Sequence, residues 1–106
     1  DAKRDWGFAG DYVEMMWLML QQENPDDYVI ATGETHTVRD LCETVFTKLG
    51  MDYRDYVVQN PKYMRPEELK YLKGDPSKAK EILGWTPEYT FSSMIDEMIE
   101  RWEREL

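Results

Sequence analysis

The stretch TVRDLCETVFTKLG, residues 37–50, carries the clearest structural signal in the chain. Thr37 is placed to cap a helix N-terminus, and Gly50 stands just past the end, where a left-handed residue closes many helices. Between them, apolar residues recur at the i, i+3, i+4, i+7 spacing of one helix face, namely Val38, Leu41, Cys42, Val45, Phe46 and Leu49. The stretch therefore predicts an amphipathic helix with one buried face.

Two further helices are predicted toward the C-terminus. Asp75-Pro76-Ser77 offers an N-cap with proline at the first helical position, and Gly84 marks the end, so a short helix is expected before it. The last helix starts at Thr90. Its apolar stripe consists of Phe91, Met94, Ile95, Met98, Ile99 and Trp102. That pattern is typical of a surface helix with one buried face.

The first predicted helix, residues 11–22, ends at Asn24-Pro25 and has a different pattern. Apolar side chains cover most of its circumference: Val13, Met15, Met16, Trp17, Leu18, Met19 and Leu20. This indicates a helix buried on two sides, for which a chain of this size has little core. We expect something outside the chain to pack there. The alternative is that Met and Trp side chains fill an irregular core.

Short strands complete the expected fold. Residues 27–32 (DYVIAT) have the composition of a strand that turns at Gly33-Glu34, and Tyr56-Val57-Val58 is a second candidate. Asn60-Pro61 and Arg65-Pro66 mark a loop. The prediction is a mostly helical α+β fold of four helices with two or three short strands, forming a single lobe over residues 1–106.

Length and charge limit the classes of function. The chain has 106 residues, and size scaling predicts about 6,200 Å² of exposed surface, with roughly two-thirds of the unfolded surface buried. A complete dinucleotide-dependent enzyme needs roughly two to three times this length. The net charge of −9 argues against nucleic acid and anionic membranes as general partners.

The location of the protein is indicated by weaker features. The single cysteine, Cys42, cannot form an internal disulfide and favours a reducing, cytoplasmic setting. No apolar run reaches the ~20 residues of a transmembrane helix, and no apolar segment of a signal peptide follows the first charges. Because the sequence begins on Asp1 without a methionine, we expect a fragment or a processed chain.

Catalytic motifs are missing from the sequence. It has no Ser/His/Asp arrangement, no Cys/His metal spacing, no G-x-G-x-x-G and no P-loop. His36, the single histidine, lies just before the predicted helix cap, where a turn role is the simplest interpretation. Adjacent acidic pairs such as Glu67-Glu68 are most simply solvated charges. The residues alone therefore predict no catalytic, cofactor or metal site.

Two arginines stand out in this acidic chain. Arg4 sits beside Asp5-Trp6, and Arg65 precedes a proline that restricts its backbone. Local structure can hold each guanidinium so that it presents a planar fork to a phosphate. Each is also compatible with an ordinary surface or salt-bridge arginine, and the residue pattern alone leaves both interpretations open.

Longer segments carry a family resemblance. They are DAKRDWG (1–7), DYV (11–13), WLMLQQ (17–22), IATGETHTVR (30–39), Arg65-Pro66 with Glu68, GDPSKAK (74–80) and LGW (83–85). On these segments the chain resembles the GDP-mannose 4,6-dehydratase family of extended short-chain dehydrogenases/reductases. The LGW segment is common to many nucleotide-sugar epimerases and dehydratases. The first block, taken together with residues 31–39, is specific to the GDP-mannose branch.

The resemblance implies that the chain is one of the two parts of a larger enzyme. In this family an amino-terminal Rossmann domain binds NADP and carries the catalytic residues, and the chain lacks that domain. It looks like the carboxy-terminal lobe that binds GDP-mannose, with Arg4 and Arg65 clamping the diphosphate. Glu68 would accept hydrogen bonds from ribose hydroxyls or another sugar group. The resemblance thus implies a lyase whose isolated lobe does not catalyse, with weak residual binding of GDP-mannose or GDP.

Partners and alternatives follow from the same comparison. We expect the missing Rossmann domain to be the natural partner, and the isolated chain to self-associate through residues 13–20. Phe8, Gly10 and Leu69-Lys70 depart from the family pattern and put the details of the pocket in doubt, although the clamp stays intact. Two alternatives remain open at this point: a small helical interaction module that kept the fold, or the equivalent lobe of a related nucleotide-sugar epimerase.

Overall fold

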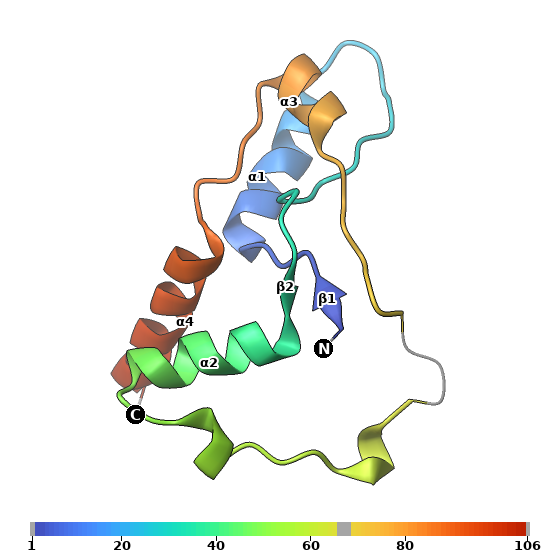
Figure 1. Ribbon diagram of the computed structural model, residues 1–106. Coiled ribbons are helices and arrows are strands. Elements are labelled where there is room, and N and C mark those ends of the chain that lie inside the picture. The colour runs from blue at the N-terminus through green and yellow to red at the C-terminus, as the bar shows by residue number, and fades with distance from the viewer. Residues whose placement is uncertain (1, 66–68, 106) are drawn as a thin grey trace.

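Four helices and one two-stranded sheet make up the described part of the chain, residues 2–65 and 69–105 of a computed structural model (Figure 1). The helices are α1 (Ala9–Leu20), α2 (Val38–Lys48), α3 (Ser77–Leu83) and α4 (Phe91–Glu105). The strands are β1 (Lys3–Arg4) and β2 (His36–Thr37), and 3-10 turns lie at Tyr53–Asp55 and Pro61–Tyr63. The predicted mostly helical α+β fold is confirmed.

The strand β1 lies between two other segments. It pairs antiparallel with β2, with Lys3 opposite Thr37 and Arg4 opposite His36. On its other side, Lys3 forms a parallel bridge with Tyr71. The Lys3 amide donates to the carbonyl of residue 70 at 2.8 Å, and the amide of residue 72 donates to the Lys3 carbonyl at 3.0 Å. Segments far apart in the sequence therefore meet around β1.

The helix ends follow the predicted caps. The Thr37 hydroxyl accepts from the Asp40 amide at 2.9 Å, the Asp40 carboxylate accepts from the Thr37 amide at 2.9 Å, and Gly50 has φ 74°. Gly84 closes α3 with φ 65°. The helix α3 begins one residue later than predicted, at Ser77. These local signals were sufficient to place α2 and α3.

Two of the predicted strands are wrong. Residues 27–32 and 56–58 are neither helix nor strand, because none of the described residues offers them a ladder partner. Residues 28–30 nevertheless keep the alternating side-chain pattern of a strand. Tyr28 and Ile30 pack against the core while Val29 between them is 53% exposed. Residues 27–32 thus have strand sequence without strand pairing.

The helix α1 has two apolar faces, as its sequence indicates. One face buries Met15 completely against Ala79 and Trp85, with Leu18 and Met19 packed beside it. The opposite face is exposed and consists of Val13 (58%), Met16 (54%), Trp17 (60%) and Leu20 (82%). We call these four residues the outer face of α1. Met15, expected at an outside contact, belongs to the core instead.

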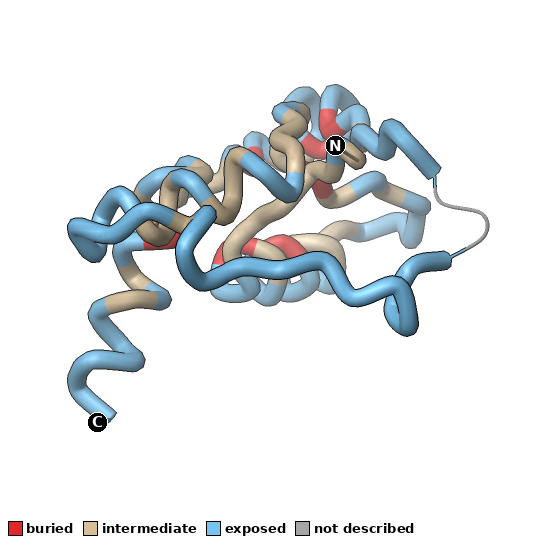
Figure 2. Tube along the Cα trace, turned by 60° about the horizontal axis from the view of Figure 1, so that its bottom comes forward, coloured by how far each residue is buried: buried red, intermediate tan, exposed pale blue. Residues whose placement is uncertain are grey.

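The molecule is more open than size scaling predicts. Its exposed surface is 8350 Å² and its radius of gyration 16.6 Å, against about 6,200 Å² and about 13 Å for a compact domain of this length. Helices α1 and α3 form one packed group and α2 and α4 another, where Lys48 pairs with Asp96 at 2.7 Å. Residues 49–63 run around the edge almost wholly exposed (Figures 1 and 2). The expected burial of two-thirds of the surface is therefore wrong.

Candidate binding site

Arg4 is anchored at the centre of the β1 region. Its Nη1 donates to the main-chain carbonyls of Lys3 at 2.8 Å and Leu69 at 2.7 Å. Two main-chain acceptors, one from the preceding residue and one 65 positions away, hold the guanidinium in place. An oriented guanidinium is the group that binds phosphate oxygens in a bidentate manner.

The contact with Leu69 also brings Arg65 into the same region. Arg65 is exposed and lies four residues before Leu69, and four residues of extended chain span at most about 14 Å. The Cα atom of Arg65 therefore lies within about 14 Å of that of Leu69, the residue that Arg4 contacts. Glu68, the third predicted site residue, lies outside the described residues.

The carboxylate of Asp5 joins three segments next to Arg4. Its Oδ1 accepts from the amide and the hydroxyl of Thr32, and its Oδ2 accepts from the amides of Gly33 (2.9 Å) and Gly74 (3.2 Å). Burial raises the pKa of Asp5, but these hydrogen bonds outweigh burial and leave the pKa below its usual value. A Cβ on Gly74 would stand 2.2 Å from that of Ala31, so only glycine allows this approach.

A second carboxylate, Asp11, positions the chain that enters α4. Asp11 is 3% exposed, and its carboxylate accepts from the amides of Glu88 at 3.2 Å and Tyr89 at 3.1 Å. The Asp11 carbonyl accepts from the indole N–H of the buried Trp85 at 3.2 Å. These bonds hold residues 85–89 against the start of α1, which sets where Tyr89 and the first turn of α4 lie.

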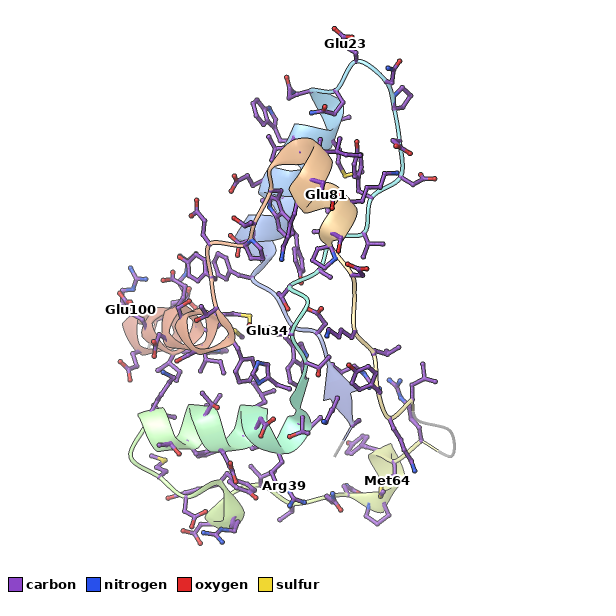
Figure 3. All side chains as sticks on the ribbon, turned by 45° about the horizontal axis from the view of Figure 1, so that its top comes forward. Glu23, Glu34, Arg39, Met64, Glu81 and Glu100 are labelled. Atoms are coloured by element: carbon purple, nitrogen blue, oxygen red, sulfur yellow. The ribbon has the colours of Figure 1, made fainter. Side chains whose placement is uncertain are left out.

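A cavity of about 190 Å³ opens between β2 and the start of α4. It is lined by Trp6, Thr32, Glu34, His36, Pro87, Tyr89, Thr90 and Phe91. The His36 ring stacks on Phe91 with 3.8 Å between centroids, and Tyr89 stacks on Phe8 at 4.0 Å. Figure 3 shows Glu34 between α4 and the strands. We call this the β2–α4 cavity.

Sequence reasoning missed the β2–α4 cavity. His36 was interpreted as a turn residue, whereas it belongs to β2 and faces the chain around residues 87–91. A local sequence pattern does not predict a contact between residues more than 50 positions apart. The only available signal was the segment IATGETHTVR, which the resemblance marked as distinctive.

The described residues show no cluster of three or more His, Cys, Asp or Glu side chains that could hold a metal ion. None of the helices in that same part of the chain combines the length and the apolarity needed to cross a membrane.

Comparison with known proteins identifies the family. A family model described as GDP-mannose 4,6 dehydratase matches residues 1–98. The chain belongs to the GDP-mannose 4,6-dehydratase family. It is 56% identical over 108 residues to GDP-mannose 4,6 dehydratase 2 of Arabidopsis thaliana and 43% identical over 116 residues to the human GDP-mannose 4,6 dehydratase. These alignments cover 98% and 93% of the chain, but 29% and 31% of the two relatives.

Solved structures that match the chain share its fold. RMD from Pseudomonas aeruginosa, complexed with NADPH, matches with a TM-score of 0.85 at 21% identity over 100% of the chain and 34% of RMD. The UDP-glucose 4-epimerase of Thermotoga maritima, solved with UDP-glucose, matches with a TM-score of 0.85 at 25% identity over 98% of the chain and 32% of the epimerase. The chain thus spans about a third of the length of the proteins it matches.

Proposed function

We propose that the chain is the carboxy-terminal substrate-binding lobe of a GDP-mannose 4,6-dehydratase, a lyase that converts GDP-mannose into GDP-4-keto-6-deoxymannose. Residues 1–106 act as a single lobe in this proposal. The observation that carries it is the bond from Arg4 to the Leu69 carbonyl, which joins the two arginine-bearing segments in a chain of this family. A cytoplasmic location belongs to the same proposal.

The diphosphate of GDP-mannose is the group that Arg4 and Arg65 would bind. In a chain with net charge −9, an anion approaches favourably only where cations are fixed in place. Arginine supplies charge and planar orientation together. A carboxylate complements it because it accepts hydrogen bonds from hydroxyls, whereas arginine only donates. Glu68 takes that role toward the ribose or another sugar group in this proposal.

The cofactor of such an enzyme is NADP, and the described residues do not fit it. A dinucleotide site needs a parallel sheet whose glycine-rich turn leads into a helix N-terminus. The described residues form a two-residue antiparallel pair and one parallel bridge instead. We therefore assign NADP to a separate Rossmann domain and derive no chemical step on this chain.

The open shape supports a domain partner. The exposed surface exceeds that of a compact domain of this length by about 2,100 Å², which is within the range of large, permanent interfaces. The outer face of α1 is the surface that such a partner would cover. When the partner is absent, the outer face of α1 is the surface on which we propose that the chain self-associates.

Titration with GDP and with UDP, followed by NMR, tests the proposal. GDP should bind weakly, and Arg65→Ala should weaken it by about 1–3 kcal/mol, the value of a lost charged hydrogen bond. Arg104→Ala, on the exposed last turn of α4, is the matched control and should leave GDP binding unchanged. Stronger binding of UDP would favour the epimerase lobe. No nucleotide binding by the folded chain would favour the interaction module.

A further inference from the structure

An apolar groove lies between α2 and α4, which pack side by side (Figure 1). Its volume is about 430 Å³, and it shares no lining residue with the β2–α4 cavity. The apolar walls consist of Leu41, Val45 and Leu49 on α2 and of Met98, Ile99 and Trp102 on α4. We call this surface the α2–α4 groove.

The α2–α4 groove is closed toward the start of α4 and open toward its end. Ile95 is 1% exposed, whereas Met98 and Trp102 on the same face of the helix are 54% and 65% exposed. An ion pair of 2.7 Å between Lys48 and Asp96 holds the end of α2 against the first half of α4. Residues 100–105 are exposed, and the end of α4 projects from the rest of the chain (Figure 2). The groove therefore presents apolar side chains to the solvent.

The shape of the groove favours a helix over a small molecule. Sites for small molecules enclose most of the ligand surface, but Met98 and Trp102 are more than half exposed along one wall. Two helices packed side by side offer a row of apolar side chains, against which the apolar face of a third helix packs. A helix as long as α4, which has 15 residues and is roughly 22 Å long, covers this row.

The charges around the groove select the chemistry of that helix. Residues 96–105 of α4 carry five carboxylates and two guanidinium groups, and Glu103 lines the groove next to Trp102. A lysine or arginine of a partner can therefore lie over the Trp102 ring and pair with the Glu103 carboxylate. A second copy would bring the same acidic helix, in a chain of net charge −9, against this one, and like charges oppose such a contact.

We propose that the α2–α4 groove docks a basic amphipathic helix of a partner protein, with Trp102 and Glu103 as the anchor. Tryptophan is among the residues that contribute most to the binding energy of interfaces, and Trp102 is exposed at the open end of this groove. The proposal goes beyond nucleotide-sugar binding and does not depend on it, because none of the site arginines takes part.

Two designed peptides serve as probes. Both have about 14 residues, with leucine at the i, i+3, i+4, i+7 positions of one helix face, and the other positions are lysine in one peptide and glutamate in the other. The chain has four tryptophans, whose indole N–H signals in NMR locate the bound peptide. The lysine peptide should shift the Trp102 signal and leave that of Trp17 in place. The glutamate peptide should bind at least about tenfold more weakly.

Two variants have matched controls, and circular dichroism checks that each variant is folded. Trp102→Ala should weaken binding of the lysine peptide about tenfold or more, whereas Trp17→Ala, the same change on the outer face of α1, should not. Glu103→Lys should also weaken it about tenfold. Glu81→Lys changes the net charge equally on the exposed surface of α3 and should have a much smaller effect (Figure 3).

Each other result overturns the proposal. Equal effects of Trp102→Ala and Trp17→Ala, or of Glu103→Lys and Glu81→Lys, would show that the peptide binds elsewhere or through net charge alone. Equal affinity for the two peptides, or no binding of the lysine peptide to the folded chain at millimolar concentration, would do the same. Loss of self-association in Trp102→Ala, measured by light scattering, would assign the groove to a second copy of the chain instead.

Discussion

Asp5 is the residue that most directly connects the stability of the chain to the geometry of the site. Its carboxylate holds the amides of Thr32, Gly33 and Gly74. Of its neighbours in sequence, Arg4 contacts the Leu69 carbonyl and Trp6 lines the β2–α4 cavity. The sequence predicted the α2 cap at Thr37, because a cap is read within four residues. It did not predict the role of Asp5, because the groups that bind this carboxylate lie 27 to 69 positions away.

The charge of Asp5 should make the free energy of unfolding depend on pH. Its pKa in the folded chain lies below its usual value, so its stabilisation is complete above the unfolded pKa near 3.8 and is lost as the pH falls through the folded pKa. Asp5→Asn turns an amide NH2 toward main-chain N–H donors. We expect it to lower the free energy of unfolding by about 1.5–3 kcal/mol at pH 7 and much less near pH 2.

Urea unfolding at several pH values between 2 and 7 measures this difference, with Glu43→Gln on the exposed face of α2 as the control. A difference between Asp5→Asn and the unchanged chain that stays constant over the whole pH range would show that the Asp5 charge does not provide the stabilisation.

At the level of elements, the helices were predictable and the strands were not. The apolar periodicity of α2 and α4 and the glycine after α3 are local signals, and each of these helices lies within one or two residues of its predicted position. A strand depends on a partner supplied by another part of the chain. The residues 27–32 have the sequence of a strand but no ladder partner in the described chain, whereas two-residue strands formed at β1 and β2 without any alternating pattern.

The outer face of α1 should drive self-association of the isolated chain. Val13, Met16, Trp17 and Leu20 are all more than half exposed, and burying ~400 Å² of such surface gains on the order of 10 kcal/mol before association costs of similar size. Trp17→Glu should therefore shift the chain toward the monomer without loss of helix content. Light scattering on a dilution series, together with circular dichroism, measures both.

Trp102→Glu is the matched control, because Trp102 is 65% exposed on α4, away from the outer face of α1. A chain that is monomeric at high micromolar concentration before any substitution would contradict the prediction, and so would an oligomer that responds to Trp102→Glu instead.

At the scale of the whole molecule, the exposed surface and the radius of gyration are larger than the length of the chain predicts. Size scaling by length predicted a compact lobe, but the radius of gyration and the exposed surface are those of an open one. Scaling rules describe chains that bury their own apolar surface. This chain leaves the outer face of α1 and the edge residues 49–63 exposed, so the rule overestimates its burial. In the sequence, the two apolar faces of α1 were the one feature that indicated this exposed apolar surface.

The isolated chain should have no dehydratase activity. The reaction requires a hydride acceptor, which side chains do not replace, and the described residues do not fit a dinucleotide. Incubation with GDP-mannose and NADP should yield no 4-keto-6-deoxy product above the control without protein. Supplying a Rossmann domain from a relative in trans is the complementary measurement. Turnover by the chain alone would overturn the assignment of cofactor chemistry to a separate domain.

The central position of β1 has a consequence for the order of events during synthesis. Within residues 1–106, Lys3 and Arg4 are synthesised before their hydrogen-bond partners, which are residues 36–37 and 69–72. Contacts between distant residues form late, because the intervening chain must first be closed into a loop. The hydrogen bonds that hold β1 and the Arg4 guanidinium are therefore completed only after translation has passed residue 72, well after Arg4 itself is synthesised.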